Sequence, residues 1–125
     1  MIILYDMVTM VTRPWGSYEV LSRGEKFLSK KITVLPSQRL SLQSHEHRSE
    51  HWVVVSGEGE ITLGKDVLQC SCNTSAFIPC GVKHRIRNIS ASRELIFVEV
   101  QIGDVLEESD IIRYEDDYDR KTVTN

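Results

Sequence analysis

All four histidines of this chain lie in two short segments of the sequence. His45, His47 and His51 occupy the stretch QSHEHRSEHW, and His84 occupies PCGVKHRIRN. Imidazole, carboxylate and amide oxygen all suit a divalent first-row metal, and imidazole is the commonest ligand of the three. Because the first segment also holds a glutamine and glutamates, the grouping indicates a metal site.

Strand alternation indicates which of these side chains point inward. Residues 43, 45 and 47 would share one face of a strand, and Glu50 would share the face of Trp52. By the same rule His84 shares a face with apolar neighbours, while lysine and arginine occupy the other face. We therefore expect His84 to point into the protein, where a histidine near other donors is a ligand candidate.

The segments that position these residues have the period-two pattern of β-strands. Clusters of Gly, Pro, Asn and Ser separate them at short intervals. No long segment keeps a helical apolar stripe, and residues 105–113 are expected to hold at most a short turn of helix. The sequence thus predicts an all-β fold, an antiparallel sandwich or barrel. The expected strands are 27–35, 40–44, 52–55, 61–63, 75–78, 82–86 and 95–102.

Length, charge and composition exclude several classes of protein. A chain of 125 residues has room for one domain, expected to cover residues 1–125. The formal charge of −3 provides no basic field for nucleic acid. No apolar run approaches the ~18 residues of a membrane helix, and the N-terminus lacks the basic lead of a signal peptide. The three cysteines fit no zinc-site spacing. We expect a reduced, cytoplasmic protein with neither a nucleic-acid nor a membrane partner.

Two motifs around the histidines resemble those of the cupin superfamily. Glu50 and Gly57 are separated by six residues, and PCGVKHRIRN reads Pro-x-Gly-x-x-His-x-x-x-Asn. The resemblance implies a cupin-type double-stranded β-helix, a jelly-roll barrel. Ser37 and Asn73 stand where each motif would open with glycine, so both turns carry different residues and the sequence leaves their geometry open.

The resemblance also implies a set of metal ligands. The superfamily motif places three or four residues between its His-x-His pair and its glutamate. Gln43 and His45 meet this spacing with Glu50, whereas the pair His45 and His47 leaves only two residues. The expected ligands are therefore Gln43, His45, Glu50 and His84. His47 then faces the substrate, and the alternative that His47 is itself a ligand stays open.

A narrower resemblance covers residues 13–120. The stretches RPWGSYEVL, LSLQSHEHRSEHWVVVSGEGEI and FVEVQIGDVLEESDIIRYEDDYDR are similar to the isomerase domain of type II phosphomannose isomerases. That family implies interconversion of mannose 6-phosphate and fructose 6-phosphate, in the synthesis of GDP-mannose and polysaccharide precursors. Its members often carry a mannose-1-phosphate guanylyltransferase domain in front. These 125 residues hold no glycine-rich nucleotide loop, so no guanylyltransferase activity is expected of them.

The implied reaction needs a metal, a base and cations for the sugar phosphate. One divalent ion is expected, with Zn²⁺ first and Mn, Fe, Co or Ni also compatible with the mixed donors. Glu99 interrupts the apolar strand LIFVEVQ and is the candidate base, since a buried charge in such a strand indicates a functional cavity. By similarity to type I phosphomannose isomerases, Arg113 is a second catalytic candidate, although it could simply offset nearby acids. Arg48, His47, Lys31 and Arg85 are the expected substrate-binding residues.

Two further expectations concern partners and competing functions. The apolar segment from Ile2 to Leu4 would be exposed in a monomer, so a homodimer is expected. A different metal-dependent cupin enzyme would need three histidine ligands, and the Gln43 interpretation argues against it. A non-enzymatic sugar-binding or regulatory cupin is the other alternative.

Overall fold

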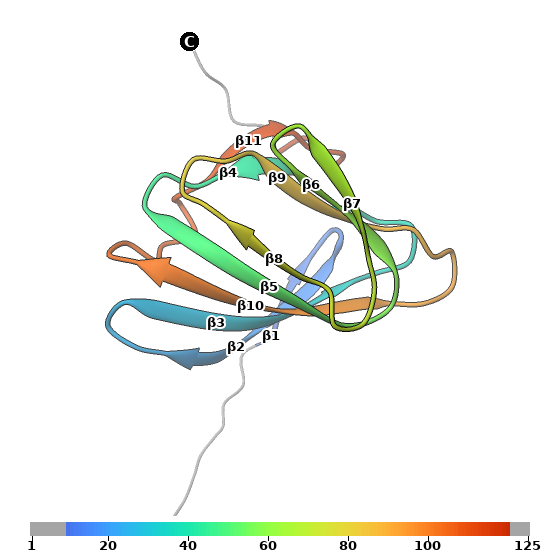
Figure 1. Cartoon of the computed structure of the whole chain (residues 1–125), viewed down its shortest axis with the longest axis horizontal. Coiled ribbons are helices and arrows are strands. Elements are labelled where there is room, and N and C mark those ends of the chain that lie inside the picture. The colour runs from blue at the N-terminus through green and yellow to red at the C-terminus, as the bar shows by residue number, and fades with distance from the viewer. Residues whose placement is uncertain (1–9, 121–125) are drawn as a thin grey trace, which may run out of the picture.

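Eleven antiparallel strands make up the part of the chain that the computed structural model describes, residues 10–120. They form two sheets that face each other across the interior (Figure 1). The six-stranded sheet has the order β1 (Met10–Arg13), β2 (Gly16–Arg23), β3 (Phe27–Val34), β10 (Leu95–Gly103), β5 (Arg48–Ser56), β8 (Ser75–Ile78). The five-stranded sheet has the order β11 (Ile112–Glu115), β4 (Leu42–Ser44), β9 (His84–Asn88), β6 (Gly59–Leu63), β7 (Asp66–Cys70).

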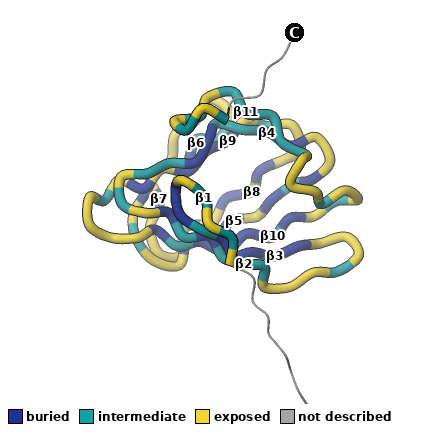
Figure 2. The backbone as a smooth tube through the Cα atoms, turned by 180° about the vertical axis from the view of Figure 1, so that it is seen from behind, coloured by how far each residue is buried: buried dark blue, intermediate teal, exposed yellow. Residues whose placement is uncertain are grey.

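The core lies between the sheets because their strands alternate buried and exposed residues. Figure 2 shows the buried positions along the inner strands and the exposed ones in the loops. Trp52, Phe97, Ile61 and Ile86 are almost completely buried. Apolar residues thus fill one part of the interior, while polar side chains occupy the part described below.

The two turns that lack the motif glycine keep a glycine-like backbone. Ser37 has φ 64° and Asn73 has φ 76°, both in the left-handed region that favours glycine. Gly57 has φ 93°, and an added Cβ would lie 2.5 Å from the carbonyl oxygen of Glu94. The turn geometry therefore survives the changes at residues 37 and 73, whereas residue 57 requires glycine.

The structure confirms the predicted all-β class and finds strands in every predicted segment. Residues 105–113, expected to hold at most a short turn of helix, hold none, since the described residues contain no helix. Consequently none of them forms a helix long and apolar enough to cross a bilayer. Strands β1, β2, β7 and β11 were not predicted. The segment from Ile2 to Leu4 lies outside the described residues.

Residues 104–120, here called the C-terminal strap, attach along the β4 edge of the five-stranded sheet. β11 in this strap pairs with β4. The Tyr114 hydroxyl lies 2.8 Å from the Ser44 hydroxyl, and Arg39 makes two hydrogen bonds to the Asp117 carboxylate. The strap is therefore fixed to the strand that leads into the histidine segment.

Candidate metal centre and cavity

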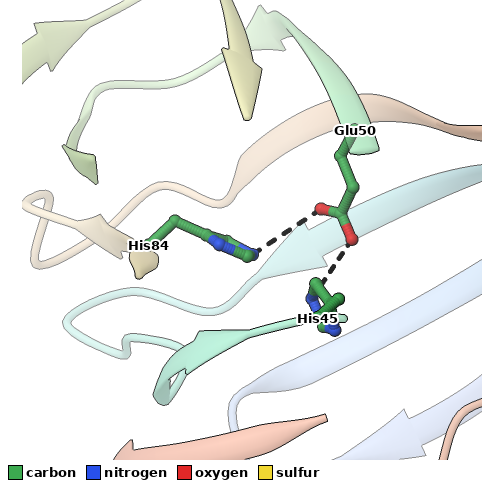
Figure 3. Close-up of side chains that lie close together, drawn as sticks. All are labelled: His45, Glu50 and His84. Carbon is green, nitrogen blue, oxygen red and sulfur yellow. Dashed lines mark ion pairs between the residues drawn. The ribbon is translucent and has the colours of Figure 1, made fainter. Parts of the chain in front are cut away.

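His45, Glu50 and His84 form a buried group of metal donors (Figure 3). They come from the β4–β5 connection, from β5 and from β9. His45 Nε2 lies 3.2 Å from one Glu50 oxygen, and His84 Nε2 lies 3.7 Å from the other. One potential ligand atom from each residue lies within 4.8 Å of the other two. Two imidazoles and one carboxylate at this spacing fit a divalent metal.

Both histidines are held in the form that a metal requires. His45 Nδ1 lies 2.6 Å from the carbonyl oxygen of Asp110, and His84 Nδ1 lies 2.9 Å from that of Val82. A carbonyl only accepts, so each Nδ1 carries the proton and each Nε2 presents a lone pair. Burial lowers the pKa of His45 to about 4 and also lowers the pKa of His84. Both rings are therefore neutral near pH 7.

Gln43 belongs to a row of residues that crosses the five-stranded sheet beside this group. Gln43 on β4 pairs directly with His84 on β9 and with Arg113 on β11. Directly paired residues share a face of the sheet, so the three side chains point inward together. The Gln43 amide nitrogen donates to Ser41. The amide oxygen is the atom that could complete the donor set.

A second row crosses the six-stranded sheet and contains Glu99. Glu99 on β10 pairs directly with Lys30 on β3 and with Trp52 on β5. The Glu99 carboxyl accepts hydrogen bonds from Gln101 Nε2 at 2.7 Å and from Trp52 Nε1 at 3.2 Å. Trp52 Nε1 also donates to Glu50 at 2.9 Å. One indole N–H therefore links the candidate base to a candidate metal ligand.

The surroundings of Glu99 give it an unusual acidity. Burial and the neighbouring Glu50 carboxylate raise the pKa of Glu99 to about 7, while Lys30 and Arg48 act in the opposite direction. Near neutral pH such a group exists in both protonation states, which a proton-transfer residue needs. Glu99 also lines a cavity between the two sheets.

Positively charged side chains predominate around that cavity. Five cations and two carboxylic acids are among the residues that line it. Lys30 pairs with Glu108, and Arg48 donates to Glu50 at 2.8 Å. The five cations are Arg13, Lys30, Arg48, Arg113 and Arg120.

Of the remaining predicted site residues, two line the cavity, two are more exposed, and Arg85 is buried elsewhere. Arg48 and Arg113 line the cavity. His47 is exposed in the β4–β5 connection and lies outside the donor group. Lys31 is on the outer face of β3, where it pairs with Glu19 at 3.6 Å. Arg85 points away from His84 on the same strand.

Strand alternation explains the last two placements. Lys31 and Arg85 each follow an inward-facing residue by one position, so their side chains point to the opposite face. Arg85 instead donates to the Leu40 carbonyl and to Glu115. The structure therefore does not bring Lys31 or Arg85 to the cavity.

Several polar residues of the cavity were not identified from the sequence. Lys30 could have been found, because it alternates with the apolar Leu28 and Ile32. Arg13 and Arg120 gave no such signal, since each lies at the end of a charged or irregular segment. Trp52 was identified only as sharing a strand face with Glu50, and its hydrogen bond to Glu99 depends on pairing between distant strands.

The fold and the inward-facing donors together define a cupin. A solved structure titled as an RmlC-like cupin from Shewanella frigidimarina NCIMB 400 superimposes with a TM-score of 0.71 at 17% identity. The match covers 82% of this chain and 87% of that one. At this identity the likeness establishes the fold alone.

The family follows from the sequence comparison. Residues 4–116 match the family described as Mannose-6-phosphate isomerase C-terminal, and the chain belongs to that family. The Xanthan biosynthesis protein XanB of Xanthomonas campestris pv. campestris is 50% identical over 110 residues, which are 88% of this chain. Mannose-1-phosphate guanylyltransferase ManC of Salmonella typhimurium is 44% identical over 116 residues, or 93% of this chain. The chain spans about a quarter of the length of these relatives, 23% and 24% respectively.

Proposed function

We propose that this domain is a metal-dependent isomerase that interconverts mannose 6-phosphate and fructose 6-phosphate. The observation that carries the proposal is the position of Glu99, a buried carboxyl with a pKa of about 7, in a cationic cavity beside the metal donors. Family membership supports the same reaction. The relatives named for xanthan biosynthesis and for mannose-1-phosphate guanylyl transfer support a role in supplying mannose units for polysaccharides.

The reaction moves a carbonyl between two adjacent carbons, which requires a proton to leave one carbon and return to the other. In the proposed mechanism the ionised Glu99 carboxylate accepts the proton and then donates it to the neighbouring carbon. Trp52 and Gln101 hold the carboxylate in one orientation through their hydrogen bonds. Lys30, directly opposite on β3, provides a positive charge near the oxygens on which negative charge develops.

His45, Glu50 and His84 would hold the metal, with Gln43 as the proposed fourth ligand. When bound, a divalent ion acts as a Lewis acid that polarises the substrate's carbonyl oxygen. The chain's own contribution is to keep both histidines neutral and fixed through the backbone carbonyls of Asp110 and Val82. Arg48, buried against Glu50, limits the negative charge of the donor group.

An assay of sugar-phosphate turnover tests this proposal. The chain is stripped with a chelator, reloaded separately with Zn, Mn, Fe, Co and Ni, and incubated with mannose 6-phosphate. We expect fructose 6-phosphate to form with at least one metal and not in the chelated sample. If the folded, metal-loaded protein binds the sugar phosphate but does not convert it, the isomerase proposal fails and the sugar-binding alternative takes its place.

A further inference from the structure

Three arginines from separate segments converge on the cavity. Arg13 ends β1, Arg113 lies on β11, and Arg120 ends the described part of the C-terminal strap. All three are half-buried, so part of each side chain faces the cavity and part faces solvent. The other two cavity cations, Lys30 and Arg48, are buried and pair with Glu108 and Glu50. These three therefore form a distinct group, here called the arginine cluster.

The members of the cluster are close enough to repel one another. Burial lowers the pKa of Arg113, and the charges of Arg120 and Arg13 lower it further. Asp116 offsets part of this charge, because it accepts hydrogen bonds from Arg120 Nε at 2.9 Å and Nη2 at 3.1 Å. Glu108 acts on Arg113 in the same direction as Asp116, and the three guanidinium groups still outnumber these two carboxylates. Holding like charges together in a partly buried place is unfavourable unless an anion binds there.

The chemistry of the cluster favours a phosphate monoester as that anion. Guanidinium groups donate two parallel hydrogen bonds to phosphate oxygens, and several of them can surround a single phosphate. Arg13 and Arg120 each lie near the face of a tyrosine ring, Tyr18 and Tyr118 respectively, which supports the guanidinium planes. A neutral sugar hydroxyl would gain little from so much charge.

We propose that Arg13, Arg113 and Arg120 form the phosphate subsite of the cavity and that Arg13 and Arg120 determine its preference for phosphorylated sugars. The identity of the sugar rests on the proposed function, whereas anion binding by the cluster does not. The sugar carbons would then extend from the arginine cluster towards Glu99 and the metal donors.

The kinetic test uses Arg13→Gln and Arg120→Gln, with the exposed Arg23→Gln as a matched control outside the cavity. Loss of a charge-assisted hydrogen bond should raise KM for mannose 6-phosphate about 10- to 100-fold, with kcat changed much less. The preference for mannose 6-phosphate over mannose should fall by a similar factor. Arg120→Lys should recover little of it, because lysine lacks the forked geometry. Unchanged KM and unchanged preference in both glutamine variants would overturn the proposal.

A second measurement separates this proposal from the isomerase proposal. Inorganic phosphate is titrated calorimetrically into metal-free wild type, the two glutamine variants and Arg23→Gln, with thermal unfolding as the folding control. We expect wild type and Arg23→Gln to bind phosphate about 10-fold or more tightly than the cluster variants. If that holds while the metal-loaded wild type is inactive, the subsite stands and the isomerase proposal fails. Equal phosphate affinity in all folded proteins would reject the subsite.

Discussion

At Trp52, one N–H group connects the two chemical parts of the site. Its indole nitrogen donates to Glu50, a proposed metal ligand, and to Glu99, the proposed base. The Glu50 carboxylate raises the pKa of Glu99, and the shared donor is one of the groups that offset the repulsion between the two. The hydrogen bonding of Glu99 therefore depends on Trp52, which is not among the residues that line the cavity.

Replacing Glu99 by Gln removes the proton acceptor and keeps the volume and part of the hydrogen bonding. We expect kcat to fall by ~10²- to 10⁴-fold, the usual effect of losing a general base. Metal content, measured by elemental analysis, and the midpoint of thermal unfolding should remain near those of wild type. The exposed Glu107→Gln serves as the control.

The pH dependence of the wild type checks the same assignment. Only the ionised carboxylate can accept a proton, and burial followed by the charge of Glu50 raises the pKa of Glu99 to about 7. The value of kcat/KM should therefore increase with pH and level off at or below about pH 7, because a bound cation nearby would lower this pKa. Full activity of Glu99→Gln would show that another group is the base.

Replacing Trp52 by Phe tests the role of the shared N–H. The variant keeps an aromatic ring against Phe97, whose centroid lies 4.8 Å away, but leaves two buried carboxylates without this donor. We expect the free energy of unfolding to fall by about 1–3 kcal/mol. The acid limb of kcat/KM should move to higher pH, since the ionised form of Glu99 loses a hydrogen bond. If the variant loses stability but the acid limb of kcat/KM stays at the same pH, Trp52 contributes packing and does not influence the ionisation of Glu99.

Alternation along strands made several residues of the site predictable. Glu50, His84 and Glu99 are buried and inward-facing, as expected from their apolar neighbours. The same rule separates Lys30, which faces the interior, from Lys31, which faces outward. The choice of Lys31 as a substrate-binding residue rested on charge alone, and charge carries no information about which face a side chain takes.

At the scale of elements, the C-terminal strap was the least predictable part of the structure. Strands β3, β5 and β10 repeat apolar residues at every second position, which follows from one buried face. The strap lacks this pattern because it is anchored mainly by polar contacts to residues far away in the sequence, such as Lys30 to Glu108 and Arg39 to Asp117. Such pairs can be recognised only when the fold is known.

Asp110 connects the strap to the metal donors. Its carboxylate accepts hydrogen bonds from the backbone N–H groups of Glu46 at 2.9 Å and His47 at 3.0 Å, and its carbonyl accepts from His45. Burial alone would raise the pKa of Asp110, but these two N–H groups lower it below its usual value. The stabilising contribution of the Asp110 carboxylate is therefore present above its ordinary pKa and lost as the pH falls through the lowered one.

Replacing Asp110 by Ala should weaken metal binding without removing any metal ligand. The backbone carbonyl that orients His45 would lose the side-chain contacts that fix its position. Loss of such an orienting group typically reduces metal affinity 10- to 100-fold, which competition with a chelator would measure. Asp104→Ala, an exposed change in the same strap, should leave the affinity as it is. Equal affinities in the two variants would contradict a positioning role for Asp110.

At the scale of the whole molecule, the family resemblance predicted the fold more completely than the residue pattern. Periodicity alone left sandwich and barrel open, while the histidine motifs identified the cupin arrangement that the structure confirms. The homodimer stays a prediction, because the segment on which it rests lies outside the described residues. Light scattering of the purified chain would measure its mass in solution.

Metal binding should also determine the stability of the whole domain. His45, Glu50 and His84 come from separate places in the sequence and meet only in the folded state, so a metal binds the native chain far better than the unfolded one. At a free metal concentration 100 times the dissociation constant, metal binding raises the free energy of unfolding by about 2.7 kcal/mol. For a domain of this size that corresponds to roughly 10 °C in the unfolding midpoint.

The measurement is the difference in unfolding midpoint between metal-loaded and chelated samples. His84→Ala should abolish this difference, even though its cavity also lowers the stability of the chelated form. His51→Ala should preserve it, because His51 lies beside Phe77 outside the donor group. His47→Ala separates the two possible ligand sets. If His47→Ala loses the metal-dependent stabilisation while His84→Ala retains it, the ligand assignment made here is incorrect.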